Sequence, residues 1–112
     1  MKNYALGRMK QGVMNNTEAK YAKHLDELLL AKEILWYKFE GVKLRLAGNT
    51  TYSPDFAVMN KNNEIELHEV KGFWTSTARV KIKVASEQYP FKFIAVYAKT
   101  KKDGGGWKFE EI

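Results

Sequence analysis

The fold of this chain is decided by the stretch from Pro54 to Lys71, which reads PDFAVMNKNNEIELHEVK. Its first part, FAVM, is a short apolar run, and its last part, EIELHEVK, alternates between two faces. The polar segment NKNN between them has the composition of a turn. The pattern predicts two neighbouring strands joined as a hairpin.

This hairpin predicts where two carboxylates meet. If the strands are antiparallel, Asp55 at the start of the first lies beside Glu69 at the end of the second. Neighbouring carboxylates repel each other unless a cation lies between them, and oxygen-only ligands select Mg²⁺ or Mn²⁺. Lys71 points to the same side as Glu69, where its ammonium group can polarise a water molecule or stabilise charge on a phosphate. This set is typical of metal-assisted phosphodiester hydrolysis.

Upstream of the hairpin, the sequence predicts a helix that begins near Glu18 and is capped by Asn15 or Asn16. Glu18 projects from the middle of the apolar stripe, where an unpaired charge is costly to bury. Two interpretations stay open: Glu18 closes a capping box at the helix start, or it is a third carboxylate of the metal site. The stripe consists of Tyr21, Ala22, Leu25, Leu28 and Leu29.

The remaining segments predict more strands and a second helix. Residues 36–46 alternate as an extended segment with a bend at Gly41, and residues 48–50 form a turn. A helix is expected from about Ala78 to Tyr89, closed by Pro90. Strands are expected at 91–98 and 107–112, separated by a basic, glycine-rich loop. This order predicts an α+β (mixed α/β) fold with a central mixed sheet flanked by helices.

Length and composition exclude several classes of protein. The chain has 112 residues, of which 45% are hydrophobic, and this fits one compact domain rather than a disordered chain. It contains no cysteine and only 2 histidines, which excludes disulfides, a cysteine nucleophile and a typical structural zinc site. It has neither an apolar run of about 20 residues nor the start of a signal peptide. We therefore expect a cytoplasmic protein with no membrane partner.

The charge is unevenly distributed. The chain carries +6 in total, with +7 in residues 71–102 and −2 in residues 18–70. A basic stretch beside an acidic one suits a protein that binds a polyanion and works with a metal ion, although a solvated helix face rich in lysine has the same composition. Residues 1–16, which include Arg8 and Lys10, are expected to form a basic N-terminal arm, and residues 17–112 a single domain.

Several motifs together carry a resemblance to a known family. Pro54-Asp55 and Glu69-Val70-Lys71 resemble the signature of the PD-(D/E)xK nuclease superfamily. Their surroundings are similar to the bacteriophage endonuclease I family of Holliday-junction resolvases, over roughly residues 15–98. The similar segments are Thr51 to Phe56, Glu69 to Trp74, Glu87 to Pro90 with Arg79 and Lys81 before them, and Glu18 to Leu25.

The resemblance implies a restriction-endonuclease-like core and a Mg²⁺-dependent endonuclease, with Mn²⁺ as a substitute, that cuts branched DNA and leaves 5′-phosphate and 3′-hydroxyl ends. It assigns Asp55, Glu69 and the Val70 backbone carbonyl as metal ligands and Lys71 as the catalytic lysine. It assigns Glu18 as the helix carboxylate near a second metal. It also implies a phage-encoded protein in a bacterial cell and a homodimer, with residues 36–50 in the place of the intertwined strand segment.

The expected partners are therefore DNA and a second copy of the chain, with no small-molecule substrate. Large aromatic residues such as Trp36, Phe73 and Trp107 usually fill a core or an interface, and among them Trp74 is the best candidate for stacking on a base. His24 is expected at the surface or facing DNA, and His68 is expected to pack or face solvent. The residues expected to contact DNA are Arg8, Lys10, Lys20, Lys23, Trp74, Arg79, Lys81 and Lys83.

Two alternatives to junction cleavage remain. The first is a nuclease of the same superfamily that acts on duplex DNA, flaps or DNA ends. The second is a binding module that keeps the basic surface without the chemistry.

Overall fold

The computed structural model describes residues 12–72 and 74–112. The predicted DNA contacts Arg8 and Lys10, most of the predicted arm, and Phe73 lie outside the described residues. The elements are α1 (Asn16–Leu30), β1 (Ile34–Phe39), β2 (Leu44–Ala47), β3 (Thr50–Tyr52), β4 (Phe56–Asn60), β5 (Ile65–Val70), α2 (Ser76–Gln88), β6 (Lys92–Ala98), a 3₁₀ turn (Lys101–Asp103) and β7 (Trp107–Glu111). This order confirms the predicted α+β fold class.

The central sheet has five strands in the order β1-β4-β5-β6-β7. Strands β5 and β6 are parallel, and the other neighbouring pairs are antiparallel, so the sheet is mixed, as predicted. The predicted hairpin is β4 and β5, with Phe56 opposite His68. The apolar pattern of this short stretch and the length of its turn are consistent with this register.

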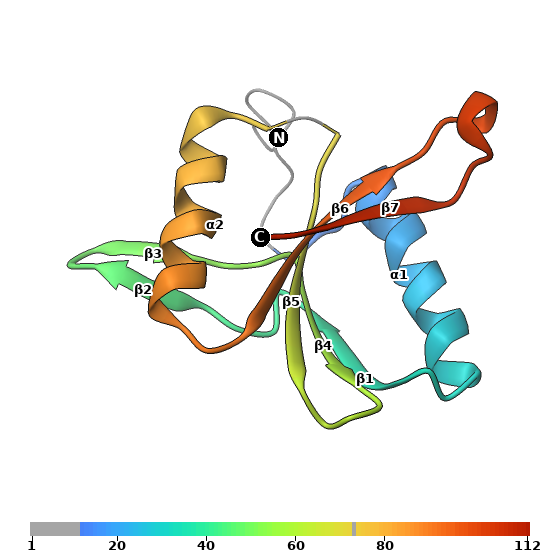
Figure 1. Cartoon of the computed structure of the whole chain (residues 1–112), viewed down its shortest axis with the longest axis horizontal. Helices are drawn as coiled ribbons and strands as arrows, with labels where there is room; N and C mark the ends of the chain where they lie inside the picture. Colours follow the sequence, from blue (N-terminus) through green and yellow to red (C-terminus); the bar gives the residue numbers. More distant parts are fainter. Residues whose placement is uncertain (1–11, 73) are drawn as a thin grey trace.

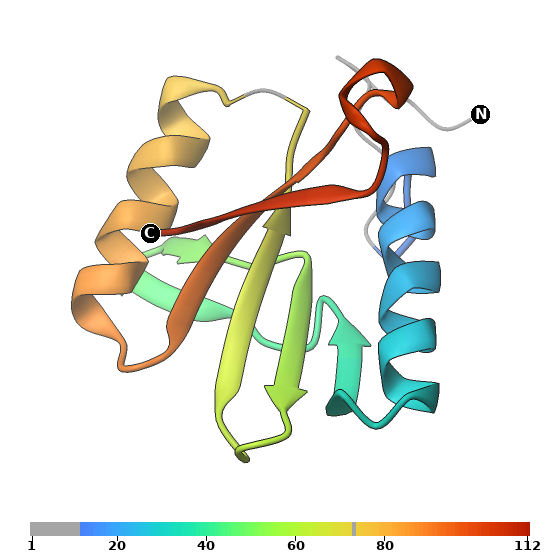
Figure 2. The ribbon, with the colours of Figure 1, turned by 45° about the vertical axis from the view of Figure 1, so that its right-hand side comes forward.

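The two helices cover opposite faces of the sheet (Figure 1). On β4, Phe56 and Val58 point to the core under α1, whereas Ala57 between them points to the core under α2. This alternation is the strand period of two, and it divides the molecule into layers with the sheet in the middle. Figure 2 shows α1 and α2 on either side of the sheet, with both helices beginning at the end where β5 finishes.

The segment predicted as one extended stretch with a bend is two strands in different sheets. After β1 the chain turns at Glu40, which has a positive φ of 49°, and β2 then pairs with β3 in a separate two-stranded sheet. Gly41 lets the chain pass closely here, since a Cβ atom would lie 3.1 Å from the Lys38 Cβ and 3.3 Å from the Ala57 Cβ. The β2–β3 hairpin is fastened to α2, where the Tyr89 hydroxyl donates to the Arg45 carbonyl at 2.6 Å.

The helix boundaries and one core residue differ from the prediction. Helix α1 begins at Asn16, the last residue of the predicted arm, with Asn15 as its cap, and α2 begins at Ser76 with Thr75 as its cap. Leu29, predicted in the apolar stripe, is 39% exposed, so it is not part of the core. Among the described residues, no helix is long and apolar enough to span a membrane.

Candidate active site

Asp55 and Glu69 meet as the hairpin predicts. Asp55 immediately precedes β4, and Glu69 is the second-last residue of β5. The Asp55 backbone N–H donates to Glu69 Oε1 at 3.2 Å, and the Val70 backbone N–H donates to Asp55 Oδ2 at 2.8 Å. Each carboxylate is thus held by the backbone of the other strand, so the position of both is set by the register of the hairpin.

Lys71 and Tyr52 complete the surroundings of Glu69. The Lys71 ammonium lies 3.1 Å from Glu69 Oε2, and the Tyr52 hydroxyl donates to Glu69 Oε1 at 2.9 Å. Sequence reasoning missed Tyr52. The signal was its place two residues before Pro54-Asp55, but the contact depends on the β2–β3 hairpin folding back over α2.

The site holds more negative charge than its surroundings neutralise. Glu69 is only 6% exposed, and burial raises its pKa against the opposing effects of Lys71 and Tyr52. The pKa of Asp55 is raised from 3.8 to about 9, first by burial, then by the charges of Glu69 and Glu18. A pair of buried carboxylates in this state takes up either a proton or a cation.

The structure supports, in part, both of the interpretations of Glu18 that the sequence left open. It forms the capping box: its backbone N–H donates to Asn15 Oδ1 at 2.8 Å, and its Oε1 accepts from the Asn15 backbone N–H at 2.9 Å. Its negative charge also contributes to the raised pKa of Asp55, so the start of α1 faces the carboxylate pair. The capping box therefore holds the Glu18 carboxylate at the end of α1 that is nearer to the site.

The donor set fits a hard divalent cation in type. Asp55, Glu69 and the Val70 carbonyl could supply oxygen ligands, which Mg²⁺ and Mn²⁺ prefer. Within residues 12–72 and 74–112, however, no three carboxylate or imidazole side chains are grouped closely enough to hold an ion between them. Glu18 is thus outside direct ligand range of the pair, and Lys71 occupies the side of Glu69 that faces away from Tyr52.

Several predicted DNA contacts have partners inside the protein. The Arg79 guanidinium lies 2.9 Å from Glu110 Oε2 and 5.1 Å from the centre of the Trp74 ring. Trp74 donates from Nε1 to the Tyr97 hydroxyl, and the Lys71 ammonium lies 5.9 Å from its ring centre. Trp74 therefore lies beside Lys71, and its ring packs against two cations of this chain.

The other predicted contacts lie on both helices. The Lys81 ammonium donates to the Thr51 carbonyl at 3.3 Å and so ties α2 to β3. Lys83 is exposed on α2, and Lys20 and Lys23 are exposed on α1, with half-buried His24 next to Lys23. The predicted residues thus form no single surface: those on α2 lie on one side of the sheet and those on α1 on the other.

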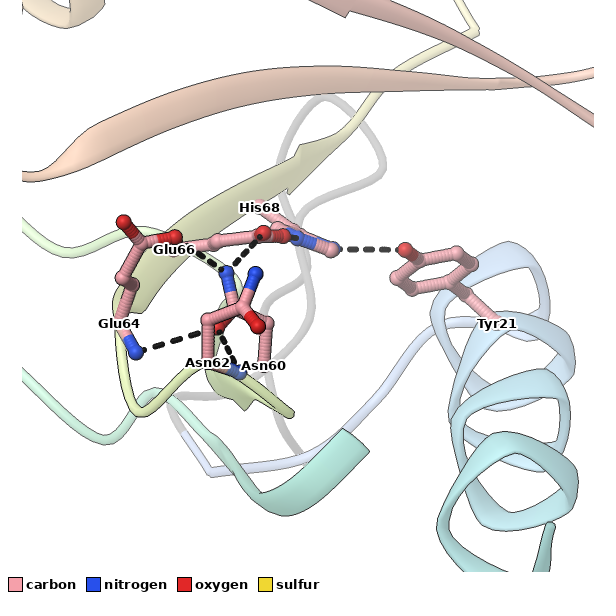
Figure 3. Close-up of polar contacts among 6 residues, drawn as sticks. All are labelled: Tyr21, Asn60, Asn62, Glu64, Glu66 and His68. Carbon is pink, nitrogen blue, oxygen red and sulfur yellow. Dashed lines mark hydrogen bonds and ion pairs between the residues drawn. The ribbon is translucent and has the colours of Figure 1, made fainter. Parts of the chain in front are cut away.

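A buried polar network joins α1 to β5 one residue from Glu69 (Figure 3). The Tyr21 hydroxyl lies 2.6 Å from His68 Nδ1, and His68 Nε2 lies 2.9 Å from Glu66 Oε1. Asn60 Nδ2 donates to Glu66 Oε2 at 2.9 Å. His68 packs under α1, in agreement with one of its two expected environments. Its bond to Tyr21 was missed, because it depends on where the helix crosses the sheet.

The match to a family model covers the candidate site but not Glu110, the partner of Arg79. The model, described as "Protein of unknown function (DUF1064)", matches residues 12–103. The chain belongs to the DUF1064 family. The matched part of this DUF1064 protein contains Glu18, Asp55, Glu69 and Lys71. A comparison with curated proteins finds no match, and neither does a comparison with solved structures.

Proposed function

We propose that this DUF1064 protein is a Mg²⁺-dependent DNA endonuclease that hydrolyses phosphodiester bonds in branched DNA and leaves 5′-phosphate and 3′-hydroxyl ends. One observation carries the proposal. Asp55 and Glu69 are held together by backbone-to-carboxylate hydrogen bonds, and the Lys71 ammonium lies 3.1 Å from Glu69. The raised pKa values of this buried pair support the uptake of a cation in place of a proton. The +7 charge of residues 71–102 supports a polyanionic substrate.

The proposed roles follow from the contacts. Asp55, Glu69 and the Val70 carbonyl would hold the ion, and Tyr52 keeps Glu69 in place by donating to Oε1. When bound, Mg²⁺ supplies Lewis-acid stabilisation of negative charge on the phosphate. The Lys71 ammonium, 3.1 Å from Glu69 Oε2, would stabilise negative charge on the phosphate or polarise the attacking water. Glu18 adds negative charge on the α1 side and favours cation binding there.

The proposal is tested by cleavage of a panel of four-way junction, flap, single-stranded and linear duplex DNA, with Mg²⁺, with Mn²⁺ and with EDTA. We expect the junction to be cut fastest and EDTA to stop cleavage. Asp55→Asn and Lys71→Met should each lower the rate about 100-fold or more. Lys61→Met is the control, because Lys61 is exposed and pairs with Glu33 away from the site. Cleavage that both site variants retain contradicts the proposal.

A second candidate function is a DNA-binding module without catalysis. It is favoured by one observation: no third carboxylate or imidazole among the described residues completes a metal site with Asp55 and Glu69. Salt-sensitive binding to every substrate of the panel, with no product in Mg²⁺ or Mn²⁺, would establish it. Faster cutting of flaps, ends or duplex than of junctions would instead identify a nuclease with another substrate.

The proposed enzyme acts as a homodimer. The edge strand β1 leaves its outer backbone groups unpaired within the described sheet, and Leu35 and Trp36 on it are 47% and 41% exposed. Sedimentation equilibrium of the full chain should give the mass of two copies. A single-copy mass throughout the micromolar range would contradict this part of the proposal.

A further inference from the structure

A groove runs along the flank of α1 that faces β7. Lys20, Lys23, His24 and Glu27 line it from the helix, and Trp107 and Phe109 line it from the strand. Its volume is about 390 Å³. Helix α1 packs chiefly on the β1 side of the sheet, which leaves this flank open beside β7. The groove is separate from the Asp55 and Glu69 pair, and none of its lining residues takes part in the proposed chemistry.

The aromatic side of the groove is partly rigid and partly exposed. Trp107 packs edge-on against buried Tyr21, with ring centres 5.0 Å apart, so it is anchored to the core. Phe109, two residues further on the same face of β7, is 50% exposed. Glu110, the residue after Phe109, points to the other face, where it pairs with Arg79. A half-exposed phenylalanine beside an anchored tryptophan offers a flat apolar surface of the kind on which nucleic-acid bases stack.

The helical side of the groove is basic. Lys20 and Lys23 are exposed, and neither belongs to an ion pair of the described residues. Glu27 is the single acid in the lining, at the end further from the start of α1. The charge of the groove is therefore complementary to a phosphate backbone.

The groove opens at the end of the molecule where the candidate site lies. Lys20 is two residues from Glu18 in the first turns of α1. Trp107, at the start of β7, pairs with Ala98 at the end of β6, and β6 runs parallel to β5, which ends at Val70. Figure 2 shows the β6–β7 hairpin reaching beside the N-terminal end of α1. A nucleic-acid chain bound at this end of the groove would therefore lie at the same end of the molecule as the candidate site.

We propose that this groove binds a single-stranded segment of nucleic acid next to the bond that is cut, with its phosphates on Lys20 and Lys23 and an unpaired base stacked on Phe109. The inference rests on the proposed function and extends it, because it names unpaired nucleotides as the feature of branched DNA that is recognised. Single strands are favoured over duplex because both faces of a paired base are already stacked and cannot receive the Phe109 ring.

Binding is tested without metal, in EDTA, so that no cleavage occurs. The probe is a short single-stranded oligonucleotide that carries 2-aminopurine, whose fluorescence is quenched on stacking. Phe109→Ala should weaken binding about tenfold and abolish the quenching, whereas Phe109→Trp should retain both. Leu30→Ala is the matched control, because Leu30 is an exposed apolar residue, 87% exposed, at the far end of α1.

The lysines are tested by salt dependence. The double variant Lys20→Ala/Lys23→Ala should lower the slope of log affinity against log salt by about 1.4, which corresponds to two phosphate contacts on a single strand. Lys61→Ala/Lys92→Ala, which removes the same charge elsewhere, should leave the slope unchanged. Unaltered single-strand binding in the Phe109→Ala and double-lysine variants overturns the inference, as does an equal loss of duplex binding in Phe109→Ala.

The outcomes separate the inference from the proposed function. If the wild-type chain cuts DNA but the groove variants bind single strands normally, the groove proposal fails and the nuclease stands. If the groove variants lose single-strand binding but no substrate is ever cut, the groove proposal holds and the proposed nuclease activity fails. Thermal unfolding of each variant followed by circular dichroism verifies that it is folded.

Discussion

The phenol of Tyr52 touches the candidate site without taking part in its proposed chemistry. It is 7% exposed and donates to Glu69, a carboxylate that is 6% exposed. The nearby charge of Glu69 and burial together raise the pKa of Tyr52, with burial as the larger cause, so the hydroxyl keeps its proton and stays a donor. A buried acceptor that loses its donor lowers the free energy of unfolding more than an exposed acceptor does, because water cannot replace the donor.

Tyr52→Phe should therefore lower the free energy of unfolding by about 1–3 kcal/mol, as measured by urea denaturation. Tyr37→Phe is the control, since the Tyr37 hydroxyl donates to Asp26 in an exposed pair, and its effect should stay within about 0.5 kcal/mol. Equal effects of the two substitutions would show that the buried bond to Glu69 contributes no more to stability than the exposed bond to Asp26.

The raised pKa of Asp55 predicts how stability depends on pH in the absence of metal. The native state keeps a proton, up to about pH 9, that the unfolded chain releases near 3.8. The contribution of this group is therefore fully present below 3.8 and is lost as the pH rises towards 9. Each pH unit in this window is worth up to about 1.4 kcal/mol.

The prediction is measured by urea denaturation of wild type and Asp55→Asn between these limits in EDTA. The stability of wild type should fall with rising pH relative to that of the variant, and Mg²⁺ should restore it for wild type alone. Parallel curves for the two proteins would contradict the raised pKa.

The contact between α1 and β5 places two candidate site residues relative to each other. Tyr21 is one turn after Glu18 on the helix, and His68 directly precedes Glu69 on the strand. When the Tyr21 hydroxyl donates to Nδ1 of a neutral His68, Nε2 carries the proton and donates to Glu66, which satisfies all three side chains. The bond thus links the helix and strand that carry Glu18 and Glu69.

Tyr21→Phe should lower the free energy of unfolding by about 1–3 kcal/mol, because it leaves a buried imidazole nitrogen without a partner. Tyr89→Phe is the control, since the Tyr89 hydroxyl bonds to an exposed carbonyl on β2. A double-mutant cycle of Tyr21→Phe with Glu66→Gln should show coupling through His68. Additive effects would mean that the two bonds are independent.

How far each element could be predicted from sequence depends on the range of the contacts that define it. The β4–β5 hairpin and the meeting of Asp55 with Glu69 were predicted, because a local alternation and a four-residue turn fix them. The separate β2–β3 sheet was not, because it is held by α2, more than 40 residues away in sequence. Tyr52 and the Tyr21–His68 bond were missed for the same reason.

The ion pair of Arg79 shows the same limit across the whole molecule. The sequence predicts that Arg79 contacts DNA, yet Glu110 on the last strand, 31 residues later, binds its guanidinium group. The pair raises the pKa of Arg79 and lowers that of Glu110, so both stay charged and neutralise each other. The positive surface that the sequence predicts from its +7 stretch is therefore weaker at this point than a count of residues indicates.

This pairing predicts that removing one acid strengthens DNA binding beyond the simple change of net charge. Glu110→Gln frees Arg79 for a phosphate, so the slope of log affinity against log salt should steepen by about 0.9 on duplex DNA between about 50 and about 200 mM salt. Glu111→Gln changes the net charge equally but frees no arginine, since no ion pair within the described ranges involves Glu111. It should leave the slope unchanged. If the two variants have the same slope, Arg79 serves to pack Trp74 rather than to bind DNA, because a free guanidinium near the site would otherwise register as an added phosphate contact.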